Sequence, residues 1–161
     1  MKIYFAAPLF CNAEKIFNEE LCNKLEHIGF EVFLPQRDGA EKTIIDSKDL
    51  EKVERRQAIF KCDYEQIGSS EIFLFVLDGR IPDEGACVEL GIAYTIKKME
   101  DKNKIIIGLH TDSRAAFIGS KLNPMIKIPI DIIFDTIEEL LEYLNQMMNS
   151  NRKNHLTTAS T

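Results

Sequence analysis

The sequence of 161 residues contains no tryptophan and only three histidines, and no apolar run in it is long. The longest runs, such as residues 72–77, are far shorter than the roughly 20 residues that a membrane-spanning helix needs. We therefore expect no membrane segment. Residues 1–4 enter a strand pattern directly and lack the layout of a signal peptide, so we expect a cytoplasmic protein.

Cysteine and positive charge are also scarce. The four cysteines are widely spaced, with no C-x-x-C motif and no cluster with histidine, so we expect reduced thiols and no metal site. Twenty Lys and Arg residues against 26 Asp and Glu give a net charge of −6, which argues against nucleic acid as a partner. A hydrophobic share of 45% still supports a full globular core.

Phosphate-binding motifs are absent as well. Neither G-x-G-x-x-G nor G-x-x-x-x-G-K-[ST] occurs, and the first predicted strand is followed by Ala-Pro-Leu-Phe-Cys at residues 7–11. That loop offers few free backbone donors and no lysine. We expect no nucleotide cofactor.

What is present is an alternation of short apolar runs with amphipathic stretches, which is typical of βαβ units. Residues 72–77 are apolar on both faces and predict a central strand. The pattern predicts an α/β fold with a doubly wound sheet, in one domain over residues 1–149 followed by a polar, disordered tail at 150–161. The expected strands are 3–7, 30–34, 71–77, 104–109 and 126–134, and the expected helices are 12–28, 46–67, 84–99 and one that begins after Thr136.

Ligands of such sheets bind beyond the carboxyl ends of the strands, which selects the loops 8–12, 35–39 and 78–83. Acidic residues follow the third strand, namely Asp78, Asp83 and Glu89. Glu89 interrupts an apolar helical segment, and two glycines in that helix, Gly85 and Gly91, suggest close backbone approaches. The alternative is a partly exposed glutamate that the helix dipole stabilises. Cys11 is a weaker nucleophile candidate, since no base accompanies it.

Several motifs together resemble the nucleoside 2-deoxyribosyltransferase family. The pattern D-x-G-x-x-x-E-x-G-x-A begins at Asp83 and ends at Ala93, and residues 3–10 (IYFAAPLF) resemble the first strand and loop of the family. Asp63 matches a further aspartate of the family pattern. Asn123-Pro124-Met125 resembles a segment that family members contribute to the pocket of a neighbouring subunit.

The resemblance implies a flavodoxin-like fold, with a five-stranded, mostly parallel sheet and helices on both faces. It implies transfer of 2-deoxyribose between nucleobases, with retention, through a covalent glycosyl-Glu intermediate and without a cofactor. Its substrates are deoxynucleosides and free purine or pyrimidine bases, as in nucleotide salvage. The roles that it implies are Glu89 as the nucleophile, Tyr4 as the residue that orients it, and Asp63 as the proton donor to the base. It also places Asp83 on the sugar, Phe10 and Gln36 on the base side, and Gly85 of the motif in the substrate site. Asp78 is added to the substrate site by its position at the end of the third strand.

The resemblance also implies a homo-oligomer, dimer-based and extending to a hexamer, in which Asn123 and Met125 enter the neighbour's site. Two alternatives remain at this stage. One is a 2′-deoxynucleoside 5′-phosphate N-glycosidase, against which the loop at residues 7–11 argues, and the other is a non-catalytic nucleotide-binding module.

Overall fold

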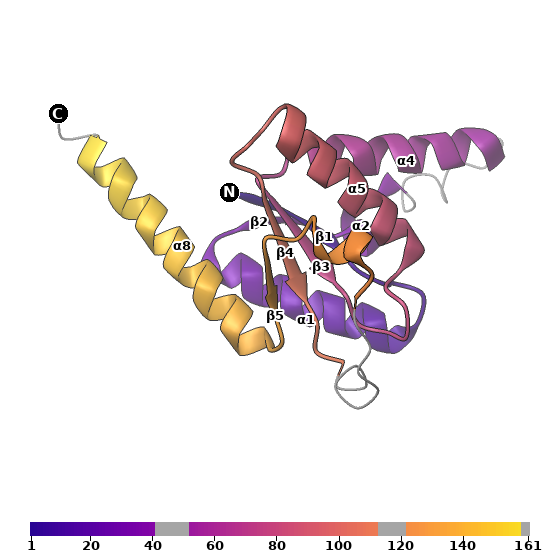
Figure 1. Cartoon of the computed structure of the whole chain (residues 1–161), viewed down its shortest axis with the longest axis horizontal. Helices are drawn as coiled ribbons and strands as arrows, with labels where there is room; N and C mark the ends of the chain where they lie inside the picture. The colour runs from indigo at the N-terminus through magenta and orange to yellow at the C-terminus, as the bar shows by residue number, and fades with distance from the viewer. Residues whose placement is uncertain (41–51, 113–121, 159–161) are drawn as a thin grey trace.

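A parallel sheet of five strands forms the centre of the molecule (Figure 1). The computed structural model describes residues 1–40, 52–112 and 122–158. The strand order is β2-β1-β3-β4-β5, and every neighbouring pair is parallel. The strands are β1 Lys2–Ala6, β2 Glu31–Phe33, β3 Ile72–Val76, β4 Ile105–Leu109 and β5 Ile132–Phe134. The predicted doubly wound α/β fold and the central place of β3 are confirmed.

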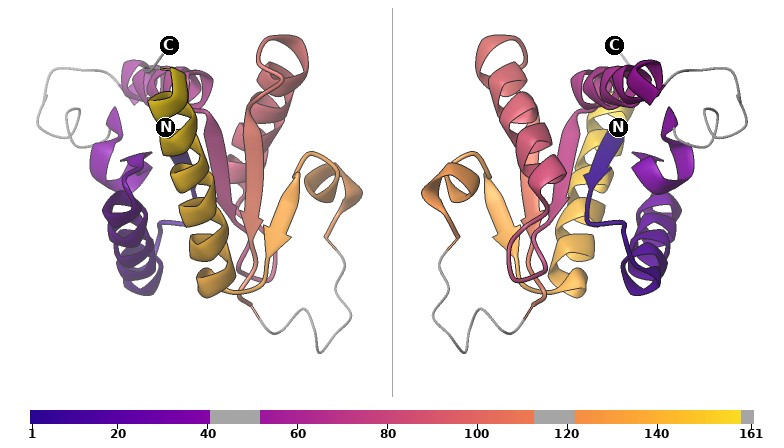
Figure 2. Two further views of the ribbon diagram at one scale, coloured as in Figure 1. Left: turned by 90° about the vertical axis from the view of Figure 1, so that its left-hand side faces the viewer. Right: turned by 90° about the vertical axis from the view of Figure 1, so that its right-hand side faces the viewer.

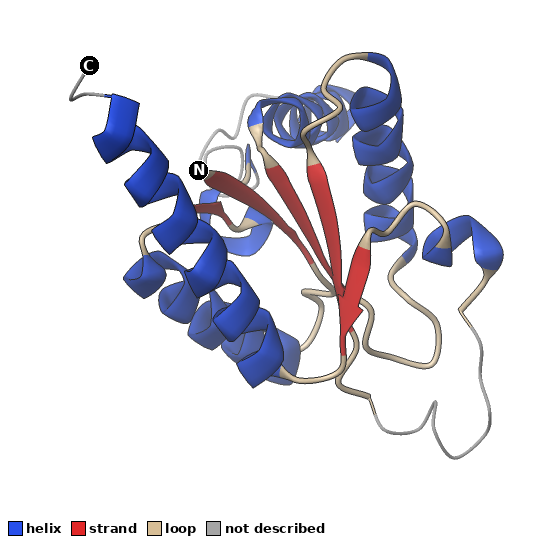
Figure 3. Ribbon diagram, turned by 60° about the vertical axis from the view of Figure 1, so that its left-hand side comes forward, coloured by secondary structure: helices blue, strands red, loops and turns tan. Residues whose placement is uncertain are grey.

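Two helical layers cover the sheet, as Figures 2 and 3 show. Helices α1 and α8 lie on one face and α4 and α5 on the other. The strand pleat divides β1 between these layers: Ile3 and Phe5 join the core under α1 and α8, whereas Tyr4 and Ala6 point toward α4 and α5. The helices are α1 Asn12–Ile28, α2 Pro35–Asp38, α4 Lys52–Ser69, α5 Glu84–Met99, α7 Pro124–Lys127 and α8 Ile137–Thr158.

Local signals at the helix ends explain most of these bounds. Gly29 ends α1 with a φ of 110°, a left-handed conformation that glycine adopts without strain. At the start of α1 the cap residue is Cys11, and the Glu14 carboxylate accepts the Cys11 amide at 2.8 Å. The side-chain oxygen of Thr136 accepts the Glu139 amide at 3.2 Å, as the predicted cap of α8 requires.

Three predicted segments differ from the structure. Residues 35–38 form α2 instead of a loop, because a proline begins the turn and the Asp38 carboxylate accepts the Leu34 amide. The start of the predicted strand 126–134 belongs to α7, which Asn123 caps and Pro124 begins, so β5 is short. The last helix continues to Thr158, past the predicted start of the tail, and Arg152 still donates to the Ile28 carbonyl at 3.4 Å.

No helix in the described ranges is long and apolar enough to cross a membrane. Within the same ranges, no group of three or more His, Cys, Asp or Glu residues could hold a metal ion.

Candidate active site

The site begins with a buried tyrosine on β1. The Tyr4 ring is fully buried and lies between Phe33 and Phe73, with ring centroids 5.6 and 5.7 Å away. Its hydroxyl donates a hydrogen bond of 2.9 Å to Oε1 of Glu89, which comes from the second turn of α5. The stacked rings fix the direction of this hydroxyl, and the hydroxyl in turn fixes the carboxylate.

The electrostatics of this pair are unusual. Burial, together with the negative charges of Asp63 and Asp83, raises the pKa of Glu89 to about 7, although the Tyr4 hydrogen bond acts in the opposite direction. Burial and the charges of Glu89 and Asp63 also raise the pKa of Tyr4, so the phenol stays protonated and acts as a donor. Glu89 is therefore a carboxylate that ionises near neutral pH in a poorly solvated position. A carboxylate with a higher pKa is more basic, and a more basic carboxylate is in general a better nucleophile than an exposed glutamate.

Asp83 supports the start of α5. Its Oδ1 accepts the Ala86 amide at 2.8 Å, which makes Asp83 the N-cap residue. A Cβ atom at Gly85 would lie 3.2 Å from this oxygen, so the glycine leaves the space that the carboxylate uses. The close approach expected at Gly91 is not observed, since no described atom lies within 4 Å of a Cβ built there.

A pocket of about 360 Å³ opens between α4 and α5 beside Glu89. Asp63 from α4 and Gly85 from α5 line it together with Glu89, and the Tyr4 hydroxyl interacts with both Asp63 and Glu89. The structure thus brings two carboxylates from different helices to one apolar cavity. The full lining is Arg56, Ile59, Phe60, Asp63, Tyr64, Ile67, Gly85, Val88, Glu89 and Ile92.

Two residues predicted for the site have other partners. The Asp78 carboxylate accepts the amides of Thr111 and Asp112 at 2.6 and 2.9 Å, so it holds the segment after β4. Gln36 accepts from the Asn18 amide group at 3.0 Å and donates to the Lys15 carbonyl at 2.9 Å, so it ties α2 to α1. Neither side chain lines the pocket.

The comparison with known proteins agrees with this geometry. A family model described as nucleoside 2-deoxyribosyltransferase matches residues 3–154. The chain belongs to this family. The resemblance that the motifs suggested is thereby confirmed. No curated protein matches the chain.

Solved structures of the same fold are also similar. A conserved protein from Enterococcus faecalis V583 is 26% identical with a TM-score of 0.70, over 91% of this chain and 98% of that one. A 2-deoxyribosyltransferase from Bacillus psychrosaccharolyticus is 22% identical with a TM-score of 0.70, over 88% and 90% of the two chains. A CMP N-glycosidase from Clostridium botulinum is 20% identical with a TM-score of 0.54, over 90% and 99%. The last two likenesses concern the fold.

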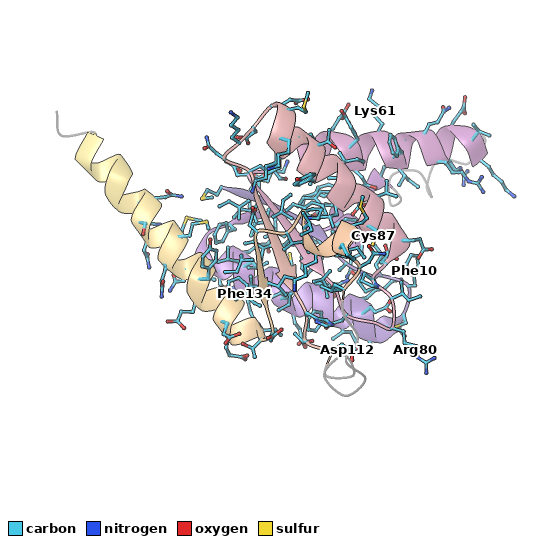
Figure 4. The ribbon with its side chains drawn as sticks, viewed as in Figure 1. Phe10, Lys61, Arg80, Cys87, Asp112 and Phe134 are labelled. Atoms are coloured by element: carbon cyan, nitrogen blue, oxygen red, sulfur yellow. The ribbon has the colours of Figure 1, made fainter. Side chains whose placement is uncertain are left out.

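Four further residues that family resemblance assigned to the site, namely Phe10, Asp83, Asn123 and Met125, do not line the pocket of this single chain. Phe10 is 76% exposed, and Figure 4 shows it on the outside of the molecule, as it does Arg80 of the loop after β3. Asn123 caps α7 by accepting the Met125 amide at 2.9 Å, and the Met125 side chain is 81% exposed. That Asn123 and Met125 enter the site of a neighbouring subunit stays a prediction.

Sequence reasoning missed the outer wall of the pocket. The Phe60 ring is 60% exposed and lines the pocket with Arg56 and Tyr64. The signal was available in the four-residue spacing of these three side chains, which places them on one face of a helix.

Proposed function

We propose that the protein transfers 2-deoxyribose from one nucleobase to another and that Glu89 is the nucleophile. The observation that supports this most strongly is the partly buried Glu89 carboxylate at the pocket, oriented by the Tyr4 hydroxyl at 2.9 Å. A carboxylate in this setting can stabilise positive charge at an anomeric carbon and can also bond to it.

In the first step, an Oε atom of Glu89 attacks C1′ of the deoxynucleoside. The C1′–N bond breaks, its electron pair stays on the base, and the base takes a proton from Asp63 as it leaves. The product is a glycosyl ester of Glu89 with inverted configuration. Two carboxyl groups with different roles are required, and Asp63 and Glu89 are the two that line the pocket.

In the second step, a nitrogen of the incoming base attacks C1′ from the opposite side. The ester C–O bond breaks, Glu89 recovers its electron pair, and Asp63 takes the proton that the base loses. Two inversions give net retention. A sugar without a 2′-hydroxyl forms an oxocarbenium-like transition state more readily, which favours 2-deoxyribose over ribose. These bond changes involve only the chain and its two substrates.

Other residues complete this proposal. Asp83 holds the sugar from the start of α5, Phe10 covers the base, and Asn123 and Met125 come from a neighbouring copy in a homo-oligomer. Transfer instead of hydrolysis requires that water be excluded from the glycosyl ester. The exposed Met125 side chain supplies an apolar surface for that purpose once a second copy is present.

The second candidate is hydrolysis of a deoxynucleotide, because the CMP N-glycosidase of Clostridium botulinum has a similar fold. Incubation of free adenine with deoxyinosine, and separately with its 5′-phosphate, separates the two. We expect deoxyadenosine to form from deoxyinosine, whereas release of hypoxanthine from the 5′-phosphate without any exchange would favour the hydrolase. Exchange that persists in Glu89→Ala would exclude Glu89 as the nucleophile.

Mass spectrometry of the intact protein tests the intermediate. After mixing with a 2′-fluorinated deoxynucleoside, which slows release of the sugar, we expect one added sugar on Glu89. The adduct should be absent from Glu89→Gln and present in Glu84→Gln, a change in the first turn of the same helix. A sugar attached elsewhere would contradict the mechanism.

A further inference from the structure

The outer wall of the pocket is a row of three side chains on α4. Arg56, Phe60 and Tyr64 follow one another at four-residue intervals, so they form a ridge along one face of the helix. All three line the same pocket as Glu89 and Asp63. The pocket therefore extends from the carboxylates along α4 to a positive charge.

The aromatic part of this ridge is suited to a planar ring. Phe60 and Tyr64 stack on each other with centroids 6.3 Å apart, yet they remain 60% and 48% exposed. Across the pocket, Val88 and Ile92 of α5 supply an apolar wall, and Val88 is 61% exposed. A flat heterocycle between the helices would cover these surfaces and gain stacking contacts.

Arg56 lies at the other end of the cavity from the reacting carbon. It precedes Asp63 by seven residues, which is about 10 Å along a helix axis. The Arg56 guanidinium makes no hydrogen bond or ion pair with the described residues, and the Arg56 side chain is exposed. Along α4 the order is Tyr64, Asp63, Phe60 and Arg56. Phe60 therefore lies between the carboxylates and Arg56, a group that only donates hydrogen bonds, whereas Tyr64 lies beside Asp63.

A purine placed with its glycosidic bond at Glu89 matches this order. Asp63 then faces N7, and Arg56 faces the substituent on C6, which lies further out on the same edge. Hypoxanthine and guanine carry an oxygen acceptor at that position, whereas adenine carries an amino donor. A pyrimidine, with one ring, reaches less far toward Arg56.

We propose that Arg56 is a specificity-determining residue that selects 6-oxopurines over adenine by donating to O6. This inference rests on the proposed function, since it takes Glu89 as the site of sugar transfer. Negative charge develops on O6 as the base departs, so the contact strengthens in the transition state and acts on the rate as well as on binding.

The test is self-exchange with labelled bases. Deoxyinosine is mixed with labelled hypoxanthine, and deoxyadenosine with labelled adenine, in wild type, Arg56→Met and Arg55→Met. We expect wild type to prefer deoxyinosine and Arg56→Met to lose about 10- to 100-fold in kcat/KM for deoxyinosine, the usual cost of a guanidinium contact to a base edge. Exchange of adenine should change little. Arg55→Met removes the same charge outside the pocket lining and should preserve the preference.

Arg56→Lys should recover part of the preference, because an ammonium also donates to O6 but lacks the fork of two donors. Equal losses for both bases, an unchanged preference in Arg56→Met, or a wild type that prefers deoxyadenosine would overturn the inference. If wild type exchanges no base at all, the proposed function fails instead. Calorimetric binding of hypoxanthine and adenine then decides the role of Arg56: a preference for hypoxanthine that Arg56→Met abolishes supports it, and equal affinities in wild type refute it.

Discussion

At the scale of single residues, Glu89 makes opposite contributions to stability and to chemistry. Its raised pKa means that the folded protein resists ionising this carboxyl, chiefly because burial removes water from it. Under the proposed mechanism, the same loss of solvation keeps the carboxylate reactive toward an anomeric carbon. Such a residue is expected to reduce stability wherever it is ionised.

The first prediction concerns Glu89→Gln and stability against pH. A carboxyl whose pKa rises from 4.5 to about 7 on folding favours the folded state in acid and loses that contribution as pH rises through 7. The full difference is about 3 kcal/mol. We expect Glu89→Gln to be more stable than wild type at pH 8 by an amount that shrinks toward pH 5, measured by urea unfolding. The exposed Glu84→Gln is the control, and a pH-independent difference would contradict the prediction.

The second prediction concerns Tyr4→Phe. The phenol hydrogen bond lowers the pKa of Glu89, so its removal should shift the acidic limb of the kcat/KM profile from near pH 7 to a higher pH. A hydrogen bond to a charged group corresponds to a shift of about 1–2 pH units. The phenylalanine ring fills the same place between Phe33 and Phe73. Tyr143→Phe on the opposite face of the sheet should leave the profile unchanged, and an unmoved limb in Tyr4→Phe would refute the role of the hydroxyl.

At the scale of elements, the end of α4 is held by a buried lysine. Lys104, which immediately precedes β4, is 1% exposed and donates to the carbonyls of Ile67 and Ser70. The Ile67 carbonyl also accepts the Ser70 amide at 3.4 Å, and Lys104 adds a charged donor to the carbonyls at this end of the helix. Asp63 lies one turn before Ile67, so Lys104 fixes the part of α4 that carries this carboxylate.

The third prediction is that Lys104→Met destabilises the protein by about 2–3 kcal/mol, because buried carbonyls lose a charged donor. Urea unfolding measures this change. Lys102→Met, in the exposed turn before β4, removes the same charge and should have almost no effect. If the two variants were equally stable, the anchoring role of Lys104 would be wrong.

Prediction from sequence succeeded where local signals and burial agreed. The bounds of α5, Glu84–Met99, follow from the Asp83 cap and the apolar spacing behind it. The motif residues Tyr4, Asp63, Asp83 and Glu89 indicated the site. Of these, Asp63 and Glu89 both interact with the Tyr4 hydroxyl. The position of Arg56 could not be predicted, because the rotation of α4 against α5 depends on tertiary packing. The burial of Lys104 likewise depends on a partner helix that no local pattern reveals.

At the scale of the whole molecule, several large apolar side chains remain uncovered. Phe10, Ile81, Met125 and Ile128 are each more than 70% exposed, at 76%, 82%, 81% and 73%. They come from the loop after β1, the loop before α5 and the α7 region. Such a surface costs free energy in water, and association with a second copy would cover it.

The last prediction is that two inactive variants restore each other. If Asn123 acts in the neighbour's site, Glu89→Gln and Asn123→Ala should each lose exchange activity, since each removes one half of every site. Unfolding and refolding the two together forms mixed dimers in which one site combines an intact Glu89 with an intact Asn123 from the partner. When the two variants pair at random in equal amounts, about half of the dimers are mixed and each mixed dimer has one intact site. The mixture should therefore show about a quarter of the wild-type exchange rate. Glu89→Gln mixed with Glu89→Ala is the control, because both variants lack the carboxylate and no intact combination forms. Activity in that control would show recovery unrelated to sharing, and a silent first mixture would mean that each chain contains its complete site.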